Sequence, residues 1–127
     1  MTSDELKNFA KRYATAWSSG DPDKVARFYA RDATISVNGA PPTSITEVAR
    51  GFARDFPDMV VTFDRLETRP DGIAFHWTFT GTNTGPGGTG NKVRISGYEL
   101  WTIDDDDLIA ESKGQFDAAE YERQLRG

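Results

Sequence analysis

The sequence predicts an α+β fold in which a strongly curved, antiparallel or mixed sheet wraps around helices. Two long runs, Ile73–Thr82 and Val93–Ile103, are rich in β-branched and aromatic residues, and the glycine-rich segment 85–90 joins them. Such runs, bounded by turn-forming residues, are typical of the two strands of a hairpin. Helical segments precede them, and a further strand and a helix follow. Runs of helices beside consecutive strands favour an α+β architecture.

Two helices are predicted at the start of the chain. Thr2 and Glu5 have the spacing of a capping box, and the apolar residues that follow recur at helical spacing as far as Trp17. Asp21 and Pro22 then mark the start of a second, shorter helix, because an N-cap residue is followed by proline in the first turn. This second helix is expected to present apolar residues up to position 29.

A short strand, a third helix and a longer strand are predicted next. Apolar and polar residues alternate over Ala33–Val37, which indicates a strand. Ser44 and Glu47 have the spacing of a second capping box, and the helix that they begin ends before Pro57. The segment Met59–Glu67 is predicted to be a strand of the main sheet.

The chain is expected to end with a strand and a helix. The strand is predicted over Leu108–Gln115, and Asp117 is expected to cap the helix. The order of elements is therefore α-α-β-α-β-β-β-β-α. Since no internal repeat or linker interrupts it, one domain over residues 1–127 is predicted.

The sheet has to bend strongly if helices this short are to cover it. Gly81 and Gly97 are isolated inside strand patterns, where they favour bulges or bends. A curved sheet closed by helices forms a cone with a blind apolar pocket. We expect any functional residues to lie between these two layers.

Composition excludes several classes of function. The net charge of -5 argues against nucleic-acid binding, because no basic stretch is present that could neutralise the phosphate groups. One histidine and no cysteine argue against zinc or copper, and the run Asp104–Asp107 lacks the spacing of a calcium loop, so no metal is expected. No apolar run approaches the roughly 20 residues that span a bilayer. The N-terminus does not resemble a signal peptide, so a cytoplasmic location is expected.

Segments spread over nearly the whole chain resemble a known superfamily. The sequences AWSSGD and FYARDA, near the N-terminus, resemble the signature of nuclear-transport-factor-2-like proteins, and later segments resemble their SnoaL-like polyketide cyclase branch. The resemblance implies a cone-shaped fold that also hosts ketosteroid isomerases, epoxide hydrolases, dehydratases and non-enzymes. The matching segments are 16–21, 28–33, 56–59, 77–82 with Gly85, 96–99, 108–112 and 116–117.

The resemblance also implies a candidate catalytic residue. In cyclases of this branch, an aspartate near the end of the last strand acts as acid and base in an intramolecular aldol ring closure, without a cofactor. Asp117 matches that position. Judged from its neighbours alone, Asp117 is the N-cap of the last helix, and the two roles are compatible.

Glu99 is the one charge on the apolar face of its predicted strand. Period-two alternation places it with Ile95, Gly97 and Trp101, whereas Arg94 belongs to the opposite face. Burying an unpaired acid among such neighbours is costly. Glu99 is therefore expected either to form hydrogen bonds inside the pocket or to be turned outward by a bulge.

Two further polar residues have both a functional and a structural interpretation. Lys113 alternates onto one face with Glu111 and Asp117, where it can pair with an acid, bind a substrate oxygen, or lie exposed at the rim. His76 lies opposite Phe75 and its aromatic neighbours along the strand. If those aromatics face the helices, His76 faces the convex side; if the strand is inverted, it is a base in the pocket.

Aromatic residues recur at core-facing positions of the predicted elements. Most are expected to pack in the core, but Trp17 and Trp101 are the best candidates for the floor and wall of the pocket. The residues expected to contact a bound small molecule are Tyr13, Trp17, Tyr29, Phe56, Trp101 and Lys113.

Three hypotheses for function follow. The first is a cofactor-free enzyme in which Asp117 or Glu99 moves a proton next to a carbonyl of a hydrophobic, polyketide-like or steroid-like molecule. Lys113, His76 or Tyr13 then stabilises the enolate oxygen. The second is a non-catalytic domain that binds a hydrophobic small molecule. The third is epoxide hydrolysis, with Glu99, Asp117 and Lys113 converging on a water. In each case a homodimer through the convex sheet face is expected.

Overall fold

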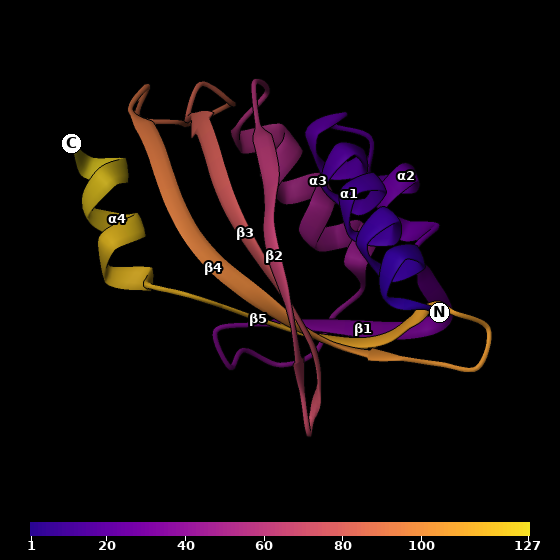
Figure 1. Cartoon of the computed structure of the whole chain (residues 1–127). Helices are drawn as coiled ribbons and strands as arrows, with labels where there is room; N and C mark the ends of the chain where they lie inside the picture. Colours follow the sequence, from indigo (N-terminus) through magenta and orange to yellow (C-terminus); the bar gives the residue numbers. More distant parts are fainter.

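The computed structural model describes residues 1–127, with four helices and one five-stranded mixed sheet (Figure 1). The predicted α+β class and the predicted order of elements are confirmed. The elements are α1 (Ser3–Ser18), α2 (Pro22–Ala26), β1 (Tyr29–Val37), α3 (Ile45–Asp55), β2 (Val60–Arg69), β3 (Gly72–Thr82), β4 (Lys92–Ile103), β5 (Ile109–Phe116) and α4 (Ala118–Arg126).

The sheet is curved and open. Its strand order is β1-β5-β4-β3-β2, with β1 parallel to β5 and every other pair antiparallel. Figure 1 shows β3 and β4 bending along their length, helices α1–α3 together on one side of the sheet, and α4 apart from them beside β4. Three helices, α1–α3, therefore cover the concave face of the sheet. The fourth, α4, lies apart from them beside β4 (Figure 1).

Neither Gly81 nor Gly97 forms a bulge, so of the two predicted alternatives the bulge is wrong, whereas the strands that carry these glycines do bend (Figure 1). Gly81 pairs with Val93 and Gly97 with Trp77 in a β3–β4 register that runs without a shift. A Cβ atom at Gly97 would collide with the Gln115 carbonyl oxygen and lie 2.8 Å from Cζ2 of Trp77. The glycine therefore allows two strands and an indole ring to approach closely.

The first strand begins earlier than the sequence pattern predicts. The prediction placed Tyr29 in the second helix, but α2 ends at Ala26 and Tyr29 is the first residue of β1, paired with Ile109 of β5. The register then shifts before Thr34 resumes regular pairing. The partner strand β5 is far away in the sequence, so the residues around Tyr29 do not themselves show this pairing. The irregular register also removes the alternation of apolar and polar residues that would indicate a strand.

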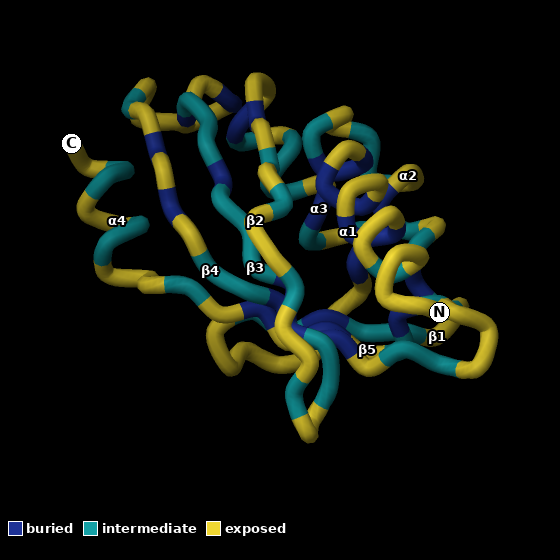
Figure 2. The backbone as a smooth tube through the Cα atoms, in the orientation of Figure 1, coloured by how far each residue is buried: buried dark blue, intermediate teal, exposed yellow.

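The core lies between the concave sheet face and helices α1–α3. Tyr13, Phe75 and Trp101 are fully buried there. Figure 2 shows buried segments on the helices and strands where the two layers meet, whereas α4 contains no buried residue. The opposite sheet face is polar and carries the exposed residues Arg94 and Ser96. A homodimer through that face stays a prediction.

Candidate functional site

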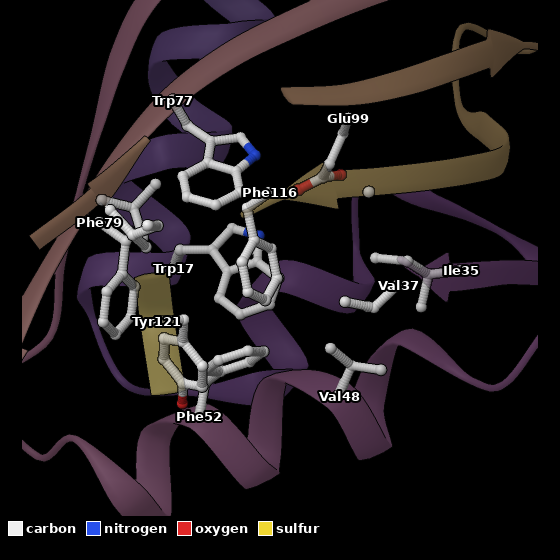
Figure 3. A pocket seen from close by; sticks show the side chains of 13 residues that line it. Trp17, Ile35, Val37, Val48, Phe52, Trp77, Phe79, Glu99, Phe116 and Tyr121 are labelled. Atoms are coloured by element: carbon white, nitrogen blue, oxygen red, sulfur yellow. The ribbon is translucent and has the colours of Figure 1, made fainter. Parts of the chain in front are cut away.

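An apolar pocket opens between the concave sheet face and the helices (Figure 3). Its cavity volume is about 60 Å³, within about 600 Å³ of empty space that includes its open mouth, and 11 of its 13 lining residues are hydrophobic. Glu99 is the only acidic group among them. The lining residues are Trp17, Ile35, Val37, Val48, Phe52, Val61, Trp77, Phe79, Ile95, Glu99, Gly114, Phe116 and Tyr121.

Glu99 is buried at this pocket, with an exposed fraction of 7%. One of its oxygens, Oε1, accepts hydrogen bonds from four side chains. Tyr13 Oη on α1 and Ser112 Oγ on β5 each donate at 2.8 Å. Trp101 Nε1 donates at 3.0 Å, and Tyr29 Oη on β1 donates at 3.2 Å. Three strands and a helix thus hold a single carboxyl oxygen.

Strand alternation and register explain this placement. Glu99 and Trp101 are two positions apart on β4, so both side chains face the helices. Ser112 pairs with Trp101 across the β4–β5 ladder, which brings its hydroxyl to the same group. Gly114 is the register partner of Glu99. Because glycine has no side chain, nothing from β5 covers the carboxyl group on that side.

The second oxygen of Glu99, Oε2, accepts no hydrogen bond from the chain. Among fully buried side-chain nitrogen and oxygen atoms, only Trp17 Nε1 has no hydrogen-bond partner. Oε2 is therefore not fully enclosed, and since Glu99 lines the pocket, the open space beside Oε2 is the pocket itself. Figure 3 shows the carboxyl group directed toward the aromatic walls.

Burial sets the electrostatics of the site. It raises the pKa of Glu99, and the hydrogen bonds from Trp101, Ser112, Tyr13 and Tyr29 oppose that rise only in part. Burial, and then the charge of Glu99, hold the pKa of Tyr13 and of Tyr29 well above the usual range. Both phenols therefore keep their protons, and their oxygens lie 2.8 Å apart.

The raised pKa of Glu99 predicts a pH-dependent stability. The unfolded chain releases this proton at lower pH than the folded chain does. The stabilisation is therefore fully present below the ordinary glutamate pKa, and it is lost as pH rises through the raised pKa of the folded state. We expect the free energy of unfolding of the wild type, minus that of Glu99→Gln, to fall by up to about 1.4 kcal/mol per pH unit in this window.

Urea denaturation across the pH range measures this difference. Glu111→Gln is the matched control, since Glu111 lies exposed on β5. It is expected to follow the wild type at every pH. A wild-type stability that rises with pH relative to Glu99→Gln would contradict the raised pKa.

Two of the predicted polar residues lie away from the pocket. Asp117 is exposed, and its Oδ1 accepts a hydrogen bond from the Glu120 backbone N–H at 3.0 Å, so it caps α4. Lys113 is also exposed, 3.5 Å from Glu111 on the same strand. The inward residues of β5 are Ser112 and Gly114, one position away on each side of Lys113. Neither Asp117 nor Lys113 lines the pocket.

His76 lies on the outer side of the sheet. Its Nε2 is 3.1 Å from Glu67 Oε1, and its ring lies beside that of Tyr98. The neighbouring Phe75 is fully buried and Trp77 lines the pocket, so the aromatics face the helices. This corresponds to the first of the two orientations that the sequence left open.

The aromatic candidates divide into three groups. Trp17 lines the pocket, whereas Tyr13 and Tyr29 do not line it but donate hydrogen bonds to Glu99. Trp101 is fully buried and donates to Glu99 without lining the cavity. Phe56 packs against Phe79 in the core, with ring centroids 4.9 Å apart, and does not line the pocket either.

Sequence reasoning missed Ser112 and most of the pocket wall. Counting backward from Phe116 in steps of two gives Gly114 and Ser112, which are the inward positions of β5. That signal was present, but the prediction took its phase from Asp117 and so selected Lys113. Tyr121 of α4 also lines the pocket, and burial raises its pKa.

The structure contains no group of three or more histidine, cysteine, aspartate or glutamate side chains placed to hold a metal ion. None of its helices has the length and apolar character needed to cross a membrane.

Comparisons with known proteins agree on the fold. Residues 10–112 match the family model described as a SnoaL-like domain. A search of curated proteins gives no match. Several solved structures superimpose well on the chain, but each is less than 25% identical to it, so these likenesses show the fold alone.

Three of these structures come with a described activity. AclR from Streptomyces galilaeus, a candidate hydroxylase, has a TM-score of 0.82 and 19% identity over 98% of this chain and 87% of its own. IdmH from Streptomyces antibioticus, a candidate polyketide cyclase, has a TM-score of 0.75 and 21% identity over 95% and 98%. SalBIII, an epoxide hydrolase/cyclase-like enzyme in pyran ring formation in the polyether salinomycin, has a TM-score of 0.77 and 16% identity over 94% and 97%.

Proposed function

Because the chain belongs to the SnoaL-like family, we propose that it is a cofactor-free acid/base enzyme that acts on an apolar, oxygenated small molecule. One observation carries the proposal. Glu99 places a carboxyl group, with one oxygen free of the chain, in a pocket whose other lining residues are almost all hydrophobic. An acid or base in such surroundings has a pKa nearer to neutrality than usual, which suits proton transfer at physiological pH.

In this proposal Glu99 transfers the proton next to a carbonyl group of the substrate. The apolar walls exclude water, so the charge that develops on the substrate is not screened. Tyr13, Ser112 and Trp101 hold Oε1 in place while Oε2 exchanges the proton. Asp117 has no such role here, because its carboxylate is exposed and caps α4.

The relatives suggest the kind of substrate. IdmH is described as a candidate polyketide cyclase, and SalBIII is described with a role in forming a ring of a polyether. The aromatic walls formed by Trp17, Trp77 and Phe116 suit a flat, ring-containing molecule of that general type.

A non-catalytic binding domain is the second candidate. The observation in its favour is that Glu99 already has four donors within the chain, as a purely structural buried acid also would. Epoxide hydrolysis is less well supported. It needs two carboxylates and a cation that converge on a water, and Asp117 and Lys113 lie outside the pocket.

Hydrogen exchange at a ketone separates an enzyme from a binding domain. The probe is β-tetralone, a flat bicyclic ketone, and NMR in deuterated water follows the loss of the protons next to its carbonyl. We expect the wild type to accelerate this exchange, and Glu99→Gln to lower the rate by about a hundredfold or more. Glu111→Gln and Asp117→Asn are expected to exchange at the wild-type rate.

Binding of the ketone is measured in parallel by the fluorescence of Trp17 and Trp77, which line the pocket. If β-tetralone binds and the wild-type exchange rate equals that of buffer, the protein is a binding domain and the enzyme proposal fails. If Asp117→Asn abolishes exchange and Glu99→Gln does not, the base has been assigned to the wrong carboxylate.

A further inference from the structure

We propose that the pocket selects ligands by a hydrogen-bond-accepting oxygen, because Glu99 meets the ligand as a neutral acid that donates from Oε2. This inference rests on the proposed function for the location of the site. It adds the protonation state in which Glu99 meets the ligand. It also adds the chemical class of the substrate, namely an apolar ring system with a carbonyl, ether or epoxide oxygen at its inner end.

The two oxygens of Glu99 are not equivalent. Four donors point at Oε1, and one of them, the indole N–H of Trp101 at 3.0 Å, can only donate. The hydroxyls of Tyr13, Tyr29 and Ser112 can rotate, but Trp101 cannot turn into an acceptor. A proton on Oε1 would compete with the Trp101 N–H for the same oxygen, because both would be donors directed at one position. Oε1 is therefore a fixed acceptor, and a carboxyl proton resides on Oε2.

Oε2 faces open space. No group of the chain donates to it. The residue opposite Glu99 on β5 is Gly114, which has no side chain, and even a Cβ atom added there would lie 4.0 Å from Glu99 Cγ. The proton on Oε2 thus has no acceptor within the chain. An oxygen of a ligand is the partner that this O–H lacks, and an unpaired buried donor favours any ligand that supplies one.

The surroundings favour the neutral form. The titratable groups that face Glu99 are Tyr13 from α1 and Tyr29 from β1, and both are neutral phenols. Strands β4 and β5 contribute Trp101 and Ser112, which do not titrate. No lysine, arginine or histidine forms an ion pair with Glu99, so burial is not offset by a positive charge.

The chemistry that follows is a proton exchange that balances. As the ligand oxygen takes the proton, the Oε2–H bond breaks and an O–H bond forms on the ligand. The four donors on Oε1 hold the resulting carboxylate. Oε2 then removes a proton from the carbon next to the former carbonyl, which yields the enol and restores neutral Glu99. Reversal of these two steps returns the ketone and leaves Glu99 neutral.

The test compares two ligands that differ only in the acceptor. β-Tetralone carries a carbonyl oxygen and tetralin is the same ring system without it, so the ratio of their affinities reports the hydrogen bond. For the wild type we expect this ratio to fall by about tenfold or more as pH rises through the raised pKa of Glu99, while tetralin affinity stays constant.

Glu99→Gln is the decisive variant. Its amide oxygen can accept the four donors, and its NH₂ group then occupies the place of Oε2 as a permanent donor. We expect this variant to prefer β-tetralone at every pH, with no pH dependence, although it does not exchange protons. Glu111→Gln is expected to behave as the wild type does.

Several results would overturn the inference. These are a preference for β-tetralone that grows with pH, a Glu99→Gln variant that has lost the preference, or no binding of either ligand detected by tryptophan fluorescence and by NMR. The proposed function fails separately. Acceptor selectivity without catalysed exchange contradicts only the enzyme, whereas Glu99-dependent exchange without acceptor selectivity contradicts only the neutral donor.

Discussion

Replacement of Glu99 by leucine is expected to lower the free energy of unfolding by about 3–5 kcal/mol, because more than one buried donor loses its acceptor. Leucine fits the apolar surroundings, but it accepts no hydrogen bond. The indole N–H of Trp101 and the hydroxyl of Ser112, both fully buried, then lose the acceptor that they have in the native structure. An orphaned buried donor costs about 1–3 kcal/mol.

The matched variant is Glu99→Gln, which has nearly the same shape and keeps an acceptor at the Oε1 position. It is expected to change the free energy of unfolding by less than about 1 kcal/mol at neutral pH, because the amide also removes the pH-dependent cost of keeping an ionisable carboxyl group out of water. Urea denaturation measures both variants. Equal stabilities of Glu99→Leu and Glu99→Gln would mean that the four hydrogen bonds contribute nothing to the fold.

Alanine at Gly97 is expected to destabilise the protein by about 2–3 kcal/mol or more, the cost of overpacking a site that cannot relax. The added methyl group would collide with the backbone oxygen of Gln115 on β5 and lie 2.8 Å from Cζ2 of Trp77. A backbone atom held in a strand ladder cannot move aside as a flexible side chain can. The β4–β5 pairing next to Glu99 would open instead.

Gly114→Ala is the control, because it adds the same methyl group to the neighbouring strand. Its Cβ would lie 3.6 Å from the Ser36 carbonyl oxygen and 4.0 Å from Glu99 Cγ, which are ordinary contacts. We expect a stability change below about 1 kcal/mol. The same urea titration compares both variants, and a Gly97→Ala protein as stable as Gly114→Ala would show that β4 and β5 can separate without cost.

Much of the fold follows from local signals. The capping residues Thr2 and Asp117 mark true helix starts, since each accepts a hydrogen bond from a backbone N–H of the first turn. The long hairpin strands follow from runs of β-branched and aromatic residues. Where local signals fail, as at Tyr29, the strand is stabilised by a partner far away in the sequence. Propensity cannot report such a pairing.

The candidate site was predictable in one residue and not in the others. Glu99 is recognisable because an acid interrupts an apolar alternation, and of its two predicted placements the structure has the buried one. Its partners have no such signal. Tyr13 is 86 positions away, and Ser112 is a small polar residue on a strand whose alternation has two possible phases. A phase error of one residue moves every side chain to the other face, which is why Lys113 was selected instead.

The sequence by itself determined the α+β class, the order of elements and the place of Glu99 in an apolar alternation, because helix caps and strand alternation act between neighbouring residues. Only the tertiary structure decided which groups meet that carboxyl group and which of its oxygens stays free. Those contacts depend on the register of β4 against β5 and on the packing of α1 against the sheet. Both are long-range choices that only the folded chain makes.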